Sequence, residues 1–504
     1  NGLRVIFLQR GSAPVAALYL KIRAGGADET EEDTGIAHML EHMLFKGTPT
    51  QGTLDYKAES RYLEVIDRWA MKYDRSRRQL EKAVAEKAPA DEIDTLKKRV
   101  SKWQYRLDLI QNDVAKYRVP DEDSLHYSLN GERGYNAYTS RDLTSYLIEL
   151  PSNRIEVWAR IESDRFKNPV FREFYTERNV VSEERRMRVE NVGSSLLLEQ
   201  FLEKVYGEHP YGPSLIGPMQ KILYFNRPQA ARFYHEHYGP DNAVIAVVGR
   251  FDESEVKGLI TKYFGDWKPR PQSSKPANNK ETSAIAAPKE PTPRKVDVEV
   301  RHSGSPAMFL AWFKPPFPDQ DDLTLEILSR VLAGSEDTRL YKRLVLKDKI
   351  AAAVSIYSGF PGERFTNLFF LSAVPVIAQD QLGDDTAIRQ SYQKIEDVVF
   401  EEIEKIAKDG VSDEEINRAK KGLATETVNQ FQSNGNLADS LTYYSVLTGN
   451  YQDTFLSYDR LTEITAEQVK QAAQKYLKKE IRMKGQLLPQ NDVKESEENE
   501  GDTP

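Results

Sequence analysis

Cysteine is absent from the 504 residues of this chain, and histidine occurs only 7 times. Without thiolates, disulfide bonds and every zinc site that uses cysteine ligands are excluded. A metal site must therefore be built from His, Asp or Glu, and two histidines at ligand spacing become an informative feature. The absence of cysteine is compatible with either an oxidising or a reducing compartment.

Excess positive charge and long apolar runs are missing as well. The formal net charge is -8, which argues against a nucleic-acid-binding surface. No apolar run in the sequence is long enough to span a membrane. An apolar content of 39% is enough for several hydrophobic cores, and 504 residues are too many for one core. We therefore expect a two-domain globular protein.

Two of the seven histidines stand in the pentad His38-Met39-Leu40-Glu41-His42. In a helix, residues at i, i+3 and i+4 share one face, so His38 and His42 direct two nitrogens at one point and Glu41 stands beside them. Neutral imidazoles can hold zinc, and a neighbouring carboxylate can take a proton from bound water. We expect Asp33 or Thr34 to cap this helix and Gly47 to end it.

A zinc site needs at least a third protein ligand. A charged helical run contains Glu177 and Glu184 seven residues apart, nearly two turns, so both carboxylates share one helix face. One carboxylate can bind the metal while the other orients a ligand or the substrate. Glu183 is the rival of Glu184, but it lies about 100° away around the helix. An acidic pair in a charged helix is, taken alone, more often a solvated face.

Further segments accompany the pentad, in one order, through the first half of the chain. They are Phe45 to Thr48, Asn136 to Ser140 with Thr144 and Tyr146, Leu150-Pro151, Glu162 to Phe166, Glu177-Arg178 with Glu184, His209 to Gly212, and Tyr238 to Asn242. With this set the chain resembles the M16 (pitrilysin-type, inverzincin) zinc metallopeptidases. The resemblance is to the shorter subfamily, which includes mitochondrial processing peptidase and many bacterial homologues.

The resemblance implies roles for particular residues. His38, His42 and Glu184 are the implied ligands of Zn²⁺, Glu41 is the implied general base, and Glu177 is the second acidic residue near the metal.

The resemblance also implies a fold and a way of holding substrate. The expected fold class is α+β, with two homologous α/β roll domains. A peptide substrate is expected to bind as an added strand, because backbone hydrogen bonds can hold an extended chain at a sheet edge. The matching segment here is Tyr135, Asn136, Ala137 and Tyr138.

Composition divides the chain into regions. A catalytic domain is expected over 1–268, with a charged helical hairpin inserted at about 57–118 that turns near Pro89. A linker rich in Pro, Ser, Asn and Lys is expected at 269–295. A second, degenerate domain is expected over 296–489, and an acidic, disordered tail over 490–504.

The second half repeats the first without its metal ligands. When the repeats are aligned on their strands and on Gly47 and Gly334, the ligand and base positions hold Leu325, Leu328 and Ser329. The expected second domain therefore cannot bind zinc at that position.

One departure concerns the second domain. Family members often supply an Arg and a Tyr from a segment resembling R-E-x-x-G-L-A-Y, to hold substrate and the oxyanion. Here Val345 and Ala352 stand at those positions. Either Arg339, Tyr341 or Arg343 substitutes, or a homologous subunit without zinc supplies the pair; we favour that partner, in a heterodimer, over a homodimer.

These observations predict a zinc-dependent endopeptidase that cleaves unfolded peptides in an enclosed cavity. The alternative is a catalytically silent assembly or peptide-binding subunit of a related complex, but such a subunit has no reason to keep Glu41. By analogy with bacterial relatives, a periplasmic location is expected.

Overall fold

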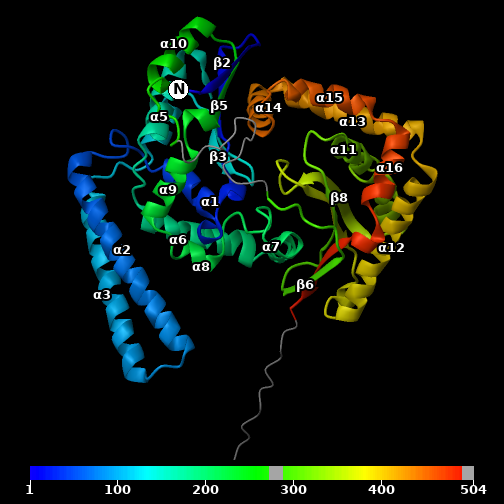
Figure 1. Ribbon diagram of the computed structural model, residues 1–504, viewed down its shortest axis with the longest axis horizontal. Coiled ribbons are helices and arrows are strands. Elements are labelled where there is room, and N and C mark those ends of the chain that lie inside the picture. The colour runs from blue at the N-terminus through cyan, green and yellow to red at the C-terminus, as the bar shows by residue number, and fades with distance from the viewer. Residues whose placement is uncertain (272–287, 491–504) are drawn as a thin grey trace, which may run out of the picture.

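In the computed structural model, residues 1–271 and 288–490 are described. Within them the chain forms two five-stranded sheets, each drawn from one half of the sequence (Figure 1). The first sheet contains β1 (Arg4–Gln9), β2 (Val15–Ile22), β3 (Arg133–Thr139), β4 (Thr144–Pro151) and β5 (Ala243–Gly249). The second contains β6 (Val296–His302), β7 (Met308–Lys314), β8 (Ala351–Phe360), β9 (Asn367–Pro375) and β10 (Met483–Pro489).

The two sheets have the same topology. Their strand orders are β1-β5-β2-β4-β3 and β6-β10-β7-β9-β8, so the first strand of each half pairs with its last. That pair is parallel in both halves, and the other neighbours are antiparallel. β3 and β8 are edge strands in equivalent positions. The expected α+β fold with two related domains is confirmed.

Helices cover the sheets and connect their strands. In the first half they are α1 (Ile36–Leu44), α2 (Tyr56–Ala85), α3 (Ala90–Ala115), α4 (Glu122–Leu129), α5 (Ile155–Lys167), α6 (Phe174–Arg185), α7 (Gly193–Tyr206), α8 (Met219–Ile222), α9 (Arg227–His237) and α10 (Glu253–Phe264). In the second they are α11 (Gln320–Leu332), α12 (Asp385–Asp409), α13 (Asp413–Gln432), α14 (Asn434–Leu447), α15 (Asp453–Glu463) and α16 (Ala466–Tyr476).

Each sheet is apolar on both faces, because successive side chains of a strand point to opposite sides. In β2, Leu18 and Leu20 enter the main core of the first half, whereas Ala17 and Tyr19 enter a separate cluster on the other face. That second cluster is completed by three side chains of α14, a helix of the second half. They are Leu437, Ala438 and Leu441.

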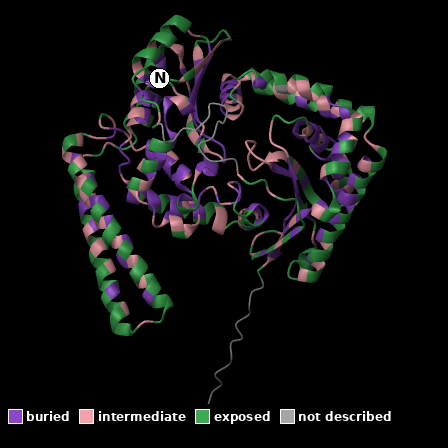
Figure 2. Ribbon diagram, viewed as in Figure 1, coloured by how far each residue is buried: buried purple, intermediate pink, exposed green. Residues whose placement is uncertain are grey.

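One face of the second sheet is covered by α7, a helix of the first half. Phe309 of β7 packs in a cluster with Leu197 and Phe201 of α7, which belongs to the first half. Leu310 and Trp312 point to the opposite face, into the core of the second half. The two halves thus exchange one helix each, and both exchanged helices contribute buried side chains (Figure 2).

The helical insertion is an antiparallel pair that projects from the first half (Figure 1). It consists of α2 and α3, and the chain reverses between Ala85 and Ala90, as the sequence predicted. We call residues 56–118 the arm. Most of its outer surface is exposed (Figure 2).

The division into domains stays a proposal. The sheet strands fall on either side of the proposed linker at 269–295, but residues 272–287 of that linker lie outside the described residues. All of the proposed tail except Gln490 lies outside them too. Among the described residues, no helix has both the length and the apolar character needed to cross a bilayer.

A buried ion pair joins the halves beside the exchanged helices. Arg364, in the loop between β8 and β9, pairs with Asp28 at 3.1 Å, and both side chains are buried. The loop backbone at Glu363 donates a hydrogen bond of 2.7 Å to Asp142. The loop of the second half is therefore anchored on two carboxylates of the first.

Arg364→Ala should lower the free energy of unfolding by roughly 3 kcal/mol, because removing one partner leaves a buried charge without compensation. Thermal unfolding of the variant beside the wild type measures this. Arg389→Ala is the matched control, since Arg389 pairs with Glu299 on the exposed surface of the second half. Equal shifts in the two variants would contradict a structural role for the buried pair.

Candidate metal centre

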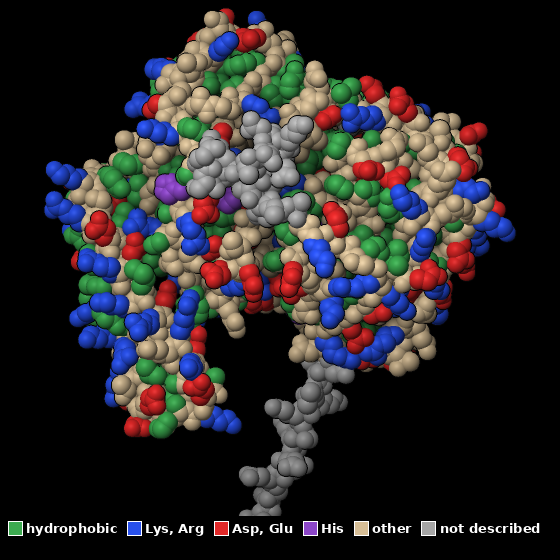
Figure 3. Space-filling view, in the orientation of Figure 1, with side chains coloured by type: hydrophobic (Ala, Val, Ile, Leu, Met, Phe, Trp, Pro, Cys, Tyr) green, Lys and Arg blue, Asp and Glu red, His purple; other side chains and the backbone are tan. Residues whose placement is uncertain are grey.

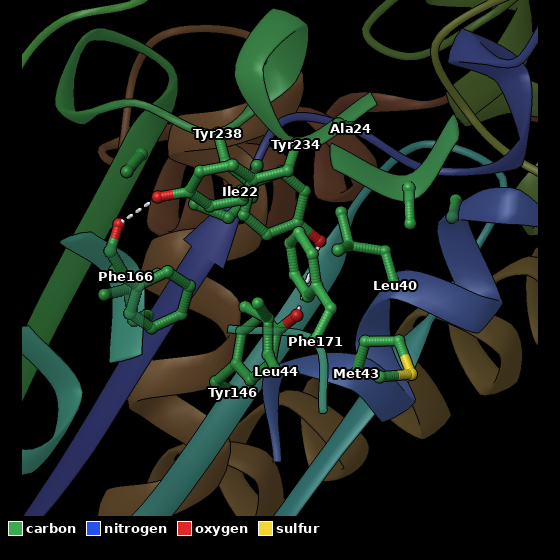
Figure 4. Close-up of a cluster of buried hydrophobic side chains, with 14 of the residues drawn as sticks. Ile22, Ala24, Leu40, Met43, Leu44, Tyr146, Phe166, Phe171, Tyr234 and Tyr238 are labelled. Atoms are coloured by element: carbon green, nitrogen blue, oxygen red, sulfur yellow. Dashed lines mark hydrogen bonds between the residues drawn. The ribbon is translucent and has the colours of Figure 1, made fainter. Parts of the chain in front are cut away.

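The candidate site begins with α1, whose apolar face is fixed in the core. Leu40, Met43 and Leu44 are fully buried against Tyr146 and Phe171 (Figure 4). The opposite face of the helix carries the two histidines and Glu41. Packing of the apolar face thus sets the direction in which the polar side chains point.

The start of α1 differs from the prediction. Its N-cap is Gly35, with φ of 98°, and neither Asp33 nor Thr34 caps the helix. Instead the Glu29 carboxylate accepts hydrogen bonds from the backbone N–H groups of Gly35 and Ala37, at 2.9 and 2.8 Å. Asp33 is engaged by Arg232. The capping carboxylate comes from a preceding turn, so the short-range capping rule missed it.

The end of α1 follows the prediction. The helix stops at Leu44, and Gly47 has φ of 82°. A Cβ at Gly47 would lie 2.5 Å from the carbonyl oxygen of Gln51 and 2.6 Å from the Arg172 guanidinium. Glycine is therefore required at this turn by conformation and by space.

His38, His42 and Glu184 meet at one point. Their ligand atoms all lie within 4.8 Å of one another. Glu184 approaches His42 Nε2 at 3.3 Å and His38 Nε2 at 3.7 Å. Ligands about 2.1 Å from a tetrahedral zinc ion stand about 3.4 Å apart, so this donor set fits zinc. Among the described residues, it is the cluster with metal-binding geometry.

Glu184, and not Glu183, faces the histidines. The side chain of Glu184 is 13% exposed, whereas that of Glu183 is 64% exposed and pairs with Arg186. Both lie on α6, which packs against α1. The helical spacing that favoured Glu184 is therefore matched by the geometry.

Glu177 lies behind His42. Its Oε1 is 2.9 Å from His42 Nδ1, and its Oε2 is 2.6 Å from Lys46 Nζ. When Nδ1–H donates to this carboxylate, His42 Nε2 is left free to accept a metal. Lys46 was part of the matched segment Phe45 to Thr48 but had no predicted role; its position one turn after His42 was the available signal.

Burial and neighbouring charges shift the pKa values of the cluster. Burial, reinforced by His42, lowers the pKa of His38 to about 4, which keeps this imidazole neutral. Burial opposes the charge on His42, but hydrogen bonds with Glu177 and Glu184 prevail and raise its pKa to about 9. The hydrogen bond with His42 in turn lowers the pKa of Glu184. Metal binding at His42 must therefore release a proton.

Glu41 stands next to the cluster and is tied to the edge of the sheet. Burial raises the pKa of its carboxyl group. Thr139, the last residue of β3, donates a hydrogen bond to Glu41 Oε2. Thr139 lies in the matched segment Asn136 to Ser140 but had no predicted role, because the contact joins residues 98 positions apart.

The predicted substrate strand is the sheet edge. β3 pairs with β4 on one side, and no second strand pairs with it among the described residues. Tyr135 donates to Asp123 at 2.6 Å, and Tyr138 donates to Asp439 of α14 at 3.0 Å. Asn136 is exposed, and Ala137 is partly buried. The strand is thus held by its tyrosines while its free edge remains open.

The equivalent position in the second half is apolar and closed. Leu325 and Leu328 are fully buried, and Ser329 is 2% exposed.

Comparisons with known proteins agree with this fold. Residues 4–116 and 121–219 match the family described as "Insulinase (Peptidase family M16)", and residues 224–423 match "Peptidase M16 inactive domain". The chain belongs to peptidase family M16.

Relatives from bacteria span almost the whole chain. An uncharacterised zinc protease of Mycobacterium leprae is 23% identical, covering 95% of this chain and 88% of that one. The zinc protease PqqE of Helicobacter pylori is 24% identical, and the match covers 90% of this chain and 85% of that one. A solved protease structure from H. pylori has a TM-score of 0.73 at 20% identity, covering 97% of this chain and 98% of that one, and so shares the fold.

The geometry predicts a graded response in zinc affinity. Glu177→Gln should weaken zinc binding by roughly 10–100-fold, because it removes the partner that orients His42. Glu184→Gln should weaken it further, and Glu183→Gln should leave it unchanged. Competition with a chromophoric chelator measures all three. A loss confined to Glu183→Gln would overturn the assignment of Glu184.

Proposed function

We propose that this chain is a zinc-dependent endopeptidase that uses His38, His42 and Glu184 as metal ligands and Glu41 as general base. The observation that carries the proposal is the convergence of three ligand atoms within 4.8 Å, with a half-buried carboxylate beside them. Membership of a peptidase family and the zinc proteases among its relatives support it.

The residues around the cluster suit this chemistry. Bound zinc supplies Lewis acidity and lowers the pKa of a water molecule. Glu41 would accept a proton from a water molecule held at this site, and its raised pKa suits a group that must take up and return a proton. Glu177 holds His42 in one tautomer, and Lys46 holds Glu177.

The free edge of β3 supports binding of an extended peptide. Backbone hydrogen bonds would hold the substrate over Tyr135, Asn136, Ala137 and Tyr138 without reading its sequence. Thr139 is the last residue of this strand, and its hydroxyl donates a hydrogen bond to Glu41. The proposed peptide-binding edge and the proposed base are therefore adjacent. Unfolded peptides are therefore the substrate class we propose.

The second half supports a requirement for a partner subunit. Val345 packs against the second core, and Ala352 has no polar side chain. Lys349 has φ of 52° at the position of the family glycine, which supports this alignment.

The two arginines among the candidate substitutes are engaged elsewhere, and Tyr341 packs against the second core. Arg339 pairs with Glu415, and Arg343 pairs with Glu401, Glu402 and Asp348. We propose that a homologous subunit without the zinc motif supplies the missing Arg and Tyr, in a heterodimer located in the periplasm.

The second candidate function is a catalytically silent, peptide-binding subunit. The replacement of the Arg and Tyr pair favours it. The retained set of His38, Glu41, His42 and Glu184 favours the enzyme, because a silent subunit needs neither a base nor ligands.

Glu41→Gln should keep zinc and abolish peptide cleavage, with a loss of roughly 10²–10⁴-fold or more, because the glutamine amide cannot accept the proton. Zinc content by elemental analysis and cleavage of an unstructured peptide, before and after chelation, provide the two measurements. Near wild-type cleavage by the variant would contradict the proposed role of Glu41 as general base. A metal-free wild type indifferent to chelator would favour the silent subunit.

The purified chain alone should be weakly active, since it lacks the Arg and Tyr pair. Activity should rise on mixing with a homologous subunit that carries the pair and lacks the zinc motif. Assays of the chain alone and of the mixture test this requirement. Full specific activity from the isolated chain, unchanged on mixing, would exclude it.

A further inference from the structure

The arm carries charge of the opposite sign to the rest of the chain. Residues 56–118 contain 16 Lys and Arg against 11 Asp and Glu, whereas the remaining residues contain 54 against 67. Blue side chains accordingly line the arm in the space-filling view (Figure 3). The arm is a basic projection on an acidic protein.

Three of the acidic residues of the arm are used at its root. Glu59, Asp67 and Asp74 are buried and pair with arginines of the body, Arg172, Arg227 and Arg178. These carboxylates are neutralised within the fold. The outer surface of the arm is therefore more basic than its composition indicates.

Six exposed cations follow one face of α2. They are Lys57, Arg61, Arg68, Lys72, Arg75 and Lys82. Because successive residues of a helix are rotated by about 100°, the six residues fall within a sector of about 80° around the axis of α2. With a rise of 1.5 Å per residue, they extend over about 38 Å along that axis. Glu64 is the acidic residue within this stripe. We call the six residues the basic stripe.

Most of the basic stripe is uncompensated. Lys57, Arg61, Arg68 and Arg75 make no ion pair or side-chain hydrogen bond with any residue of the described part of the chain. Lys72 lies 4.8 Å from the ring centroid of Trp103, and Lys82 lies 3.8 Å from Glu86. Four like charges along one helix repel one another, so an anionic surface would stabilise them.

The form of the stripe favours a flat and fluid anionic surface over a protein. Protein interfaces are depleted in lysine at their centres and are organised around buried aromatic or aliphatic anchors. The large apolar side chain exposed beside the stripe is Met71, and it is 48% exposed. Arg75 and Lys82, at the C-terminal end of the stripe, line a pocket with Met71 and Tyr224. The preference for a flat surface therefore rests on Lys57, Arg61 and Arg68, which lie outside this pocket.

We propose that the basic stripe of the arm binds the surface of an anionic lipid bilayer. Each Lys or Arg near such a surface contributes about 1 kcal/mol, and the attraction decays within a Debye length of about 8 Å at physiological salt. The long axis of the arm must therefore lie parallel to the membrane surface for all six cations to interact with the lipid headgroups. The acidic remainder of the chain is repelled by the same surface, which orients the molecule arm first.

The test uses the full chain and vesicles of phosphatidylcholine with or without phosphatidylglycerol. Wild-type protein should sediment with the anionic vesicles at low ionic strength, not with the neutral ones, and added salt should release it. The triple variant Arg61→Glu, Arg68→Glu, Arg75→Glu should lose more than about 100-fold in partition coefficient, since removing three contributions of about 1 kcal/mol already costs about 100-fold and the new carboxylates are repelled. Replacing the same residues with Gln should cause a smaller loss.

The control has the same change in net charge on another exposed surface. Lys394→Glu, Lys408→Glu, Lys421→Glu lies on α12 and α13, where the three lysines are exposed. This variant should bind anionic vesicles nearly as well as the wild type. Thermal unfolding checks that all variants fold.

Four results would overturn the proposal. Wild-type protein that does not prefer anionic vesicles, or a control variant that loses as much as the arm variant, would each do so. Tighter binding to a short DNA duplex than to anionic vesicles at the same salt would assign the stripe to nucleic acid instead. Self-association that the arm variant abolishes, without vesicle binding, would assign it to a second copy.

Discussion

The exchange of α7 and α14 between the halves is the constraint on which the rest of the structure depends. A sheet that is apolar on both faces must be covered on both faces. Each half covers one face with its own helices and leaves the other to a helix of its counterpart. Neither half can therefore bury its sheet alone, and the half that carries the candidate metal centre is complete only in the presence of the other half.

This dependence reaches the candidate site through the edge strand. α14 packs on the first sheet and carries Asp439, which accepts a hydrogen bond from Tyr138 of β3. The same strand ends at Thr139, which bonds to Glu41. The degenerate half thus helps to position the proposed base, although it contributes no ligand to the metal centre. Loss of metal ligands in the second half leaves this structural role intact.

Local pattern predicted much of the fold and of the site. The helical pair that turns near Pro89 and the end of the pentad helix before Gly47 were predicted, because charged helical periodicity and a glycine stop are local signals. The pentad predicted one helix face for His38 and His42 for the same reason. Contacts between distant segments could not be read in this way. The Glu29 cap, the bond between Thr139 and Glu41, and the exchanged helices all depend on tertiary packing.

The ion pairs at the root of the arm tie the insertion to the rest of the first half. Arg178 lies on the helix that carries Glu177 and Glu184, and Arg172 also donates to the carbonyl groups of Lys46 and Thr48, just after α1. Excising the arm would leave buried guanidinium groups without counterions next to the metal centre. In evolutionary terms, a lineage could lose this insertion only by replacing the arginines as well. A relative that has these buried arginines is therefore expected to have the arm.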